Sequence, residues 1–164
     1  MINRRNLLLG GAAVGMLAAW RWLADADGAA AESFEVEKSD AEWRSLLTKA
    51  QYDVLRHQHT ELPGSSALLA EKRAGVFACA GCDLPLFSSQ TKYDSHTGWP
   101  SFYQPLPQAV ATTTDHWLVL ARTEVHCHRC GGHLGHVFDD GPRPTGLRYC
   151  INGVALKFVA AAAA

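Results

Sequence analysis

The five cysteines of the chain fall into two groups by their spacing. Four form two C-x-x-C pairs, Cys79 with Cys82 and Cys127 with Cys130, and the fifth, Cys150, has no partner. Two such pairs supply four thiolates, which suit tetrahedral zinc. The spacing therefore predicts one structural zinc ion and one free thiol.

Other uses of the paired cysteines stay open at this point. An oxidising compartment would permit disulfides, and a single C-x-x-C pair can act as a redox dithiol. His126 and His128 flank Cys127 and offer further ligands. Since four sulfurs already complete a tetrahedron, we interpret both histidines as surface residues or supports of the ligands.

Cys150 has the surroundings of a reactive thiol. A thiol of ordinary pKa is only roughly 3 per cent ionised at pH 7, so nucleophilic chemistry needs a nearby cation or hydrogen-bond donor. Arg148 lies two residues earlier, and on a strand the two side chains would project from the same face. The opposing interpretation is a small buried residue in a core strand, which is common for free cysteine.

Further residues around Cys150 have catalytic types. His133 and His136 could carry protons near neutral pH or be structural. Taken singly, Trp99 and Phe138 would be core residues and Asn152 a turn residue. The combination favours a cysteine-based catalyst, because it joins a nucleophile, a cation, proton carriers and aromatic walls. The candidate site comprises Trp99, His133, His136, Phe138, Arg148, Cys150 and Asn152.

The pattern before and after Gly75 predicts different secondary structure. Ser39 and Thr48 each begin a capping-box sequence followed by helically spaced apolar residues, which predicts two short helices. Beyond Gly75, short apolar runs between turn residues predict a mostly antiparallel sheet, with a hairpin at Asn152-Gly153. The predicted strands are Gly75–Cys79, Trp117–Ala121, Val125–Cys127, His133–Phe138, Leu147–Ile151 and Val154–Val159.

The first 31 residues have the composition of an export signal. Arg4 and Arg5 precede a Leu- and Ala-rich run that is shorter than the roughly 20 residues needed to span a bilayer, and small residues follow it. The arginine pair resembles a twin-arginine signal, so we expect export to the periplasm. A retained membrane anchor is the alternative. We predict a signal at 1–31, one domain at 32–159 and an alanine tail at 160–164.

The charge distribution argues against one class of partner. The formal net charge is -1, and lysines and arginines are dispersed along the chain. Nucleic-acid binding needs clustered cations. We therefore expect no nucleic-acid partner.

Several motifs, in order along the chain, resemble the methionine-R-sulfoxide reductase B family. They are YDSHTGWPSF, the two C-x-x-C pairs, GGHLGHVFDDGP and TGLRYCIN, and the likeness runs from about Ser39 to Phe158. The resemblance implies a mainly β fold of two packed antiparallel sheets, short N-terminal helices and a zinc bound by four cysteines. It also implies a peptide-methionine (R)-S-oxide reductase, an oxidoreductase of protein repair and the oxidative stress response.

The resemblance implies roles for the candidate residues. Cys150 would be the nucleophile that takes oxygen from the substrate and becomes a sulfenic acid, with His133, His136 and Asn152 assisting proton transfer. Arg148 would stabilise the thiolate. Trp99 and Phe138 would hold the substrate methyl group and so select the R epimer.

Thr97 is the main departure from the family pattern. Many members carry there the cysteine that forms a disulfide with the nucleophile, and this chain has no other unpaired cysteine. We therefore expect a one-cysteine form that an external reductant regenerates, thioredoxin-like or another thiol. We also expect a monomer. The rival functions are a zinc-ribbon interaction module without activity and a thiol-disulfide oxidoreductase that uses the C-x-x-C pairs.

Overall fold

Two short capped helices open the described part of the chain. The computed structural model describes residues 33–115 and 122–162. Helix α1 spans Asp40–Leu46 and helix α2 spans Lys49–His57. Each helix begins with a complete capping box, formed by Ser39 with Glu42 in α1 and by Thr48 with Gln51 in α2. Both helix predictions are therefore confirmed.

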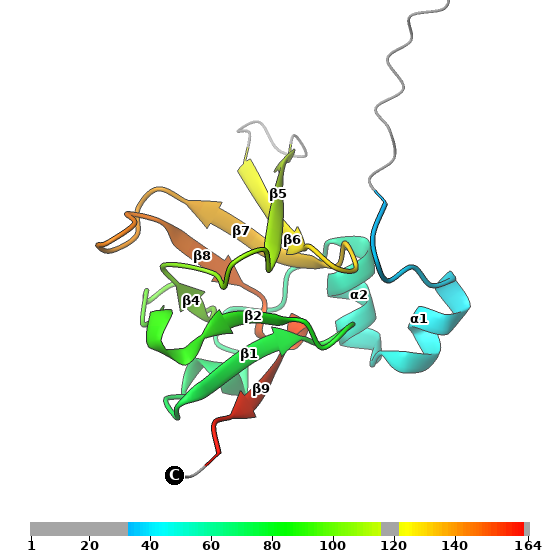
Figure 1. Cartoon of the computed structure of the whole chain (residues 1–164), viewed down its shortest axis with the longest axis horizontal. Coiled ribbons are helices and arrows are strands. Elements are labelled where there is room, and N and C mark those ends of the chain that lie inside the picture. The colour runs from blue at the N-terminus through cyan, green and yellow to red at the C-terminus, as the bar shows by residue number, and fades with distance from the viewer. Residues whose placement is uncertain (1–32, 116–121, 163–164) are drawn as a thin grey trace, which may run out of the picture. The chain divides into compact units, whose positions relative to one another are not determined.

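The remaining elements form two antiparallel sheets (Figure 1). The three-stranded sheet has the order β2-β1-β9, and the six-stranded sheet has the order β3-β4-β8-β7-β6-β5. The predicted mainly β fold is therefore confirmed. The strands are β1 (Gly75–Cys79), β2 (Pro85–Ser88), β3 (Lys92–Tyr93), β4 (Ser101–Phe102), β5 (Val110–Asp115), β6 (Arg122–Cys127), β7 (His133–Phe138), β8 (Arg148–Ile151) and β9 (Leu156–Ala160), and the 3₁₀ turns are η1 (Ala67–Leu69), η2 (Ser89–Thr91) and η3 (Gly153–Ala155).

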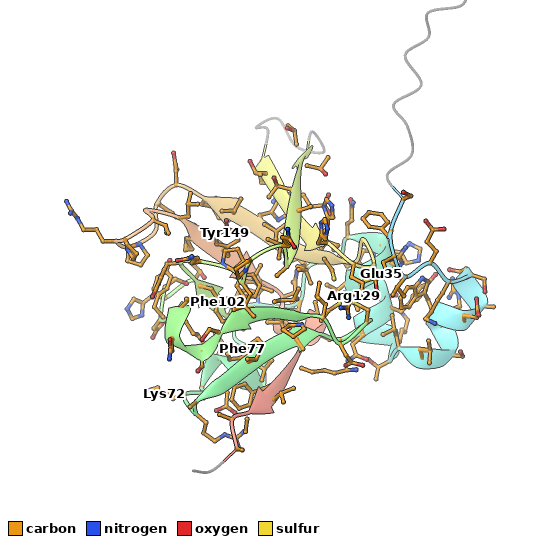
Figure 2. All side chains as sticks on the ribbon, viewed as in Figure 1. Glu35, Lys72, Phe77, Phe102, Arg129 and Tyr149 are labelled. Carbon is orange, nitrogen blue, oxygen red and sulfur yellow. The ribbon has the colours of Figure 1, made fainter. Side chains whose placement is uncertain are left out.

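Aromatic side chains join the two sheets. Phe77 of β1 is paired with Phe87 of β2, and the rings of both contact Phe102 of β4 with centroids 5.0 and 4.4 Å away. All three are fully buried. Figure 2 shows Phe77 and Phe102 between the sheets. Because such large rings bury much apolar area, this cluster holds the six-stranded sheet against the smaller one.

The predicted hairpin at Asn152-Gly153 is wrong. Strand β8 belongs to the six-stranded sheet and β9 to the three-stranded sheet, and turn η3 connects them. Asn152 has φ -62° and ψ 118°, whereas the expected hairpin turn requires a positive φ there. The chain thus changes sheets directly after the predicted site.

The other strand predictions have mixed outcomes. The bounds of β1 and β7 agree with the prediction, whereas β6 begins three residues earlier than expected. Strands β2, β3, β4 and β5 were not predicted. The predicted strand Trp117–Ala121 lies outside the described residues, because 116–121 are not described.

Only the C-terminal end of the predicted domain lies within the described residues. The predicted signal at 1–31 lies outside the described residues. At the other end, Ala160 belongs to β9 and pairs with Gly75, so the sheet includes the first residue of the predicted tail. Within the described ranges, no helix is long and apolar enough to cross a membrane.

Candidate active site

The site is built on one row of residues across the six-stranded sheet. Cys150 of β8 pairs with Ser101 of β4 on one side and with His136 of β7 on the other, and His136 in turn pairs with Glu124 of β6. Directly opposite residues in antiparallel strands project from the same face. The register therefore brings Cys150 and His136, two predicted site residues, to one face.

Gly135 allows the strands to come this close. A Cβ atom at this position would lie 2.1 Å from the carbonyl oxygen of Cys150, far inside contact distance. Any other residue would force β7 away from β8. The glycine between the two histidines is thus explained by the close approach of the Cys150 backbone.

Cys150 itself is half-buried, and this burial has the largest effect on the pKa of its thiol. Desolvation raises the pKa of the Cys150 thiol above its usual value. The hydroxyl of Thr97, with Oγ1 3.8 Å from Sγ, and the Arg148 guanidinium both oppose this rise in pKa, without overcoming it. Arg148 therefore acts on the pKa of Cys150 in the direction of a nearby cation, but burial has the larger effect.

Arg148 is held in a fixed position beside the sulfur. Its Nε and Nη2 each donate to an oxygen of Asp140 at 2.8 Å, and its Cζ lies 4.3 Å from the centre of the Phe138 ring. The same ion pair lowers the pKa of Asp140 below its usual value. One face of Phe138 is thus covered by Arg148 and does not line an open pocket.

The two histidines are in contact and one of them is oriented by a carboxylate. Their ring centroids are 5.5 Å apart in an edge arrangement. His133 Nδ1 lies 2.7 Å from Glu124 Oε1, and this hydrogen bond lowers the pKa of Glu124. An ionised carboxylate only accepts, so Nδ1 carries the proton. His133 Nε2 is buried and has no hydrogen-bond partner among the described residues.

Asn152 is bonded to the backbone on both ends of its amide. Its Nδ2 donates to the carbonyl of Leu134 at 3.0 Å, and its Oδ1 accepts from the N–H of Glu61 at 2.9 Å. The side chain is buried. Its amide therefore ties the 58–66 loop to β7.

Glu61 connects that loop to Trp99. The Glu61 carbonyl accepts from Trp99 Nε1 at 3.1 Å, and its carboxylate accepts from the N–H groups of Gly153 and Val154 at 2.5 and 3.0 Å. The N–H of Ile151 donates to the carbonyl of Pro100 at 3.0 Å, which places the Trp99–Pro100 segment beside Cys150. The indole is thus anchored to the 58–66 loop by its Nε1.

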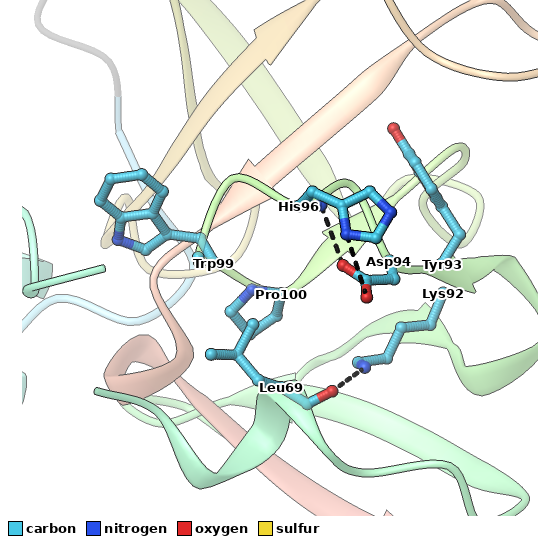
Figure 3. A pocket seen from close by; sticks show the side chains of 8 residues that line it. Leu69, Lys92, Tyr93, Asp94, His96, Trp99 and Pro100 are labelled. Carbon is cyan, nitrogen blue, oxygen red and sulfur yellow. Dashed lines mark hydrogen bonds and ion pairs between the residues drawn. The ribbon is translucent and has the colours of Figure 1, made fainter. Parts of the chain in front are cut away.

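A cavity of about 350 Å³ borders Trp99 on the edge of the sheet (Figure 3). Lys92 Nζ donates to the carbonyl of Leu69 at 2.9 Å there, and the N–H of His96 donates to Asp94 at 2.9 Å. Lys92 pairs with Phe102, so it projects from the opposite face of the sheet from Cys150. The cavity does not include the candidate nucleophile.

The four paired cysteines form a separate cluster that could hold a metal. Cys79 ends β1 and Cys127 ends β6, so the cluster joins one knuckle from each sheet. The Sγ atoms of Cys79 and Cys130 are 3.8 Å apart, those of Cys82 and Cys127 are 3.5 Å apart, and all four sulfurs lie within 4.8 Å of one another.

The geometry of this cluster fits a tetrahedral ion. Metal–sulfur distances of about 2.3 Å, as for zinc, give sulfur separations of about 3.8 Å. The cysteines are not joined as disulfides. Contact with Cys127, together with burial, raises the pKa of Cys79 and Cys130, so ionisation of all four thiols requires a cation. His128 is exposed, which agrees with a surface residue. His126 is buried near Phe34, which leaves for it the other interpretation, a support of the ligands.

Comparison with known proteins decides the family. The SelR domain family matches residues 47–160. The peptide methionine sulfoxide reductases MsrB of Leptospira interrogans, Leifsonia xyli and Agrobacterium fabrum are 53%, 55% and 51% identical to this chain. The matches cover 77%, 76% and 76% of this chain, and 97%, 91% and 93% of those proteins. The chain belongs to the MsrB family.

The MsrB domain also contains site residues that sequence reasoning missed. Glu124 orients His133, Asp140 holds Arg148, and Glu61 supports Trp99. Asp140 stands in the quoted motif GGHLGHVFDDGP and could have been found there. Glu124 and Glu61 lie in segments without such a signal, and only the fold brings them to the site.

Proposed function

We propose that this chain reduces the R epimer of methionine sulfoxide, free or peptide-bound, to methionine through Cys150. Membership of the MsrB family supports this reaction. The single structural observation that carries it is the register that sets Cys150 opposite His136 on one face of the sheet.

The reaction consumes no group of the protein except the Cys150 thiol. The Cys150 sulfur attacks the sulfoxide sulfur, and its one thiol proton passes through the histidine side to the sulfoxide oxygen. The bond between that oxygen and the substrate sulfur then breaks, and the hydroxyl ends on Cys150 as a sulfenic acid. The sulfoxide sulfur is reduced to a thioether and the cysteine sulfur is oxidised. A thiol held protonated by burial suits this step, because it brings the one proton that the oxygen takes up.

The surrounding residues have distinct proposed roles. His136 and His133 hold the oxygen side of the substrate, with His133 presenting Nε2 because Glu124 binds its Nδ1 proton. Arg148 limits the rise in the pKa of Cys150. Trp99 and the free face of Phe138 contact the methyl group, and Asn152 acts as a positioning residue for the loop that carries Glu61.

We propose a one-cysteine cycle. Thr97 stands near Cys150 where a resolving cysteine could stand, and the remaining four cysteines contact one another in the metal cluster. An external thiol, thioredoxin-like or small, would attack the sulfenic acid, release water and form a mixed disulfide that a second thiol resolves. In the variant Thr97→Cys, the introduced thiol should therefore form a disulfide with Cys150 after turnover, visible as a loss of two hydrogens in the intact mass.

We propose that the metal at the four-cysteine cluster is zinc and that its role is structural. The sulfur separations and the all-thiolate donor set support zinc. The ion would cross-link β1 and β6, and with four protein ligands it leaves no open position for substrate.

We propose that residues 1–31 direct export to the periplasm by the twin-arginine route and that 32–159 form one monomeric reductase domain. The support is the Arg4-Arg5 pair followed by a short apolar run. Export of a folded, metal-loaded domain suits this route.

The test of the reaction offers both sulfoxide epimers to the purified protein with a small dithiol. Consumption of the R epimer alone is expected, and Cys150→Ser should consume neither. Equal consumption of both epimers would contradict the proposed selectivity. Consumption of neither, by a metal-loaded and folded protein, would favour a binding module instead.

A further inference from the structure

A chain of three hydroxyl groups leads away from the nucleophile. Thr97 Oγ1 lies 3.8 Å from Cys150 Sγ and 2.8 Å from Ser95 Oγ, and Ser95 Oγ lies 2.6 Å from Ser101 Oγ. Ser101 is fully buried and neighbours Cys150 in the sheet. Its hydroxyl is also 3.1 Å from the carbonyl oxygen of Trp99, to which it donates.

Because each hydroxyl has a single proton, the direction of one hydrogen bond in this chain sets the direction of all the others. Each hydroxyl has one proton to donate. If Ser101 donates to the Trp99 carbonyl, it must accept from Ser95, which in turn must accept from Thr97. Thr97 then has no proton left for the sulfur and accepts from the Cys150 thiol.

The opposite direction is also possible. A thiolate can only accept, so Thr97 would turn its proton to the sulfur, Ser95 would donate to Thr97, and Ser101 would donate to Ser95. The Trp99 carbonyl would then lose its donor. The two directions therefore match the two ionisation states of Cys150.

We propose that Thr97, Ser95 and Ser101 form a rotating hydroxyl relay that reverses its hydrogen bonds when Cys150 loses its proton and so stabilises the thiolate and the sulfenate. Thr97 touches the reacting sulfur, and Ser95 and Ser101 act through it as positioning residues. The proposal rests on Cys150 being the nucleophile of the proposed function.

The relay does not carry the proton away. It ends on a backbone carbonyl, which cannot take up a proton at neutral pH. The proton of Cys150 must therefore leave on the substrate side, where the histidines lie. The relay instead supplies a donor after the proton has left, and the same donor suits the oxygen of a sulfenate.

Charged and titratable groups other than the three hydroxyls also affect the pKa of Cys150. Arg148 lowers and Asp140 raises the pKa of its thiol, while Tyr93 is close enough for its own pKa to respond to Cys150. His136 faces it across the strand pair. Thr97 opposes the effect of burial on the thiol pKa, which agrees with a donor at that position.

The test measures the rate of Cys150 alkylation as a function of pH in the absence of substrate. Its result therefore does not depend on whether the protein reduces methionine sulfoxide. Peptide mass spectrometry separates Cys150 from the other cysteines. Thr97→Val removes the hydroxyl at nearly constant volume and should raise the pH midpoint of alkylation by about one unit, a roughly tenfold loss of thiolate at neutral pH. Thr97→Ser, the matched control, should keep the midpoint of the unmodified protein.

The second step distinguishes a relay from one isolated hydrogen bond. Ser95→Ala should raise the midpoint in the same direction by less, and the double variant Thr97→Val, Ser95→Ala should shift no further than Thr97→Val alone. An unchanged midpoint in Thr97→Val, or an equal shift in Thr97→Ser, would overturn the role of the hydroxyl. An unchanged midpoint in Ser95→Ala, or additive shifts, would overturn the relay.

Discussion

The two sulfur regions of this protein use the same atom in opposite ways. In the cluster, each paired cysteine has other sulfurs within 4.8 Å, and tight turns present them from the ends of two strands. Cys150 lies within β8, where its neighbours are a hydroxyl and a guanidinium. Four crowded thiols favour a cation, whereas one thiol among donors can react with a substrate. The position of a cysteine in the fold, and not its residue type, thus decides whether it has a structural or a chemical role.

The largest contrast should come from removing one sulfur from each region. Cys150→Ser should lower turnover by more than about a thousandfold, because no other group can take the oxygen, while metal content and melting temperature stay unchanged. Cys127→Ser should instead lose the metal and show a strongly lowered melting temperature. Kinetics, metal analysis and thermal melting of the two variants give the comparison. Retained activity in Cys150→Ser would remove this residue from its role.

Removal of the metal should lower the stability of the fold and should not act on the reaction directly. Structural zinc contributes about 10 to 16 kcal/mol to small metal peptides, and a domain with its own core should lose a smaller but still large share. Thermal melting should therefore shift strongly downward in a strong chelator and recover with added zinc. An unshifted melting transition after complete metal removal would show that the cluster does not support the fold.

A smaller effect is expected at Glu124. Glu124→Gln keeps the shape but lets His133 adopt the other tautomer, so turnover should fall by about a hundredfold with little change in substrate affinity. Steady-state kinetics with the R epimer measure this. An unchanged turnover number would mean that the orientation of His133 does not matter.

Glu124 should also leave a signature in the pH dependence of stability. Because its folded-state pKa lies below the usual value of 4.5, its contribution, about 1 kcal/mol, is present above that pH and lost as the pH falls through the lower folded value. Glu124→Gln should remove this part of the acid destabilisation in denaturant titrations. Identical acid profiles would contradict the hydrogen bond to His133.

The smallest shift is expected at Arg148. Arg148→Ala removes a cation that opposes the effect of burial and should raise the pH midpoint of Cys150 alkylation by roughly half a unit. Arg148→Lys, which keeps the charge, should shift it less. A midpoint that does not move in the alanine variant would leave hydroxyl donors as the only activators.

Local patterns could be predicted and tertiary ones could not. The capping boxes at Ser39 and Thr48 and the C-x-x-C knuckles depend on residues within a few positions of one another. Strands β3 and β4 have two residues each, too few for any periodicity, and β5 is rich in threonine. The hairpin prediction failed because tertiary bonds of Asn152 override its turn preference.

The residues of the candidate site also fall into a group that local sequence motifs predict and a group that only the fold reveals. The residues Trp99, His133, His136, Phe138, Arg148, Cys150 and Asn152 stand in motifs that sequence comparison finds. Their supports do not, because the contacts of Glu124 and Glu61 depend on strand register and on a loop that folds back. The pairing of Thr97 with Ser95 and Ser101 likewise needs coordinates.

One measurement addresses the nucleophile directly. The protein without its first 31 residues is mixed with the R epimer of methionine sulfoxide in the absence of reductant, and the cysteine peptides are examined by mass spectrometry. One added oxygen on Cys150, in step with one methionine formed per chain, is the expected result. Methionine formed with Cys150 unmodified, or with Cys150 joined to a cysteine of the metal cluster, would contradict the account.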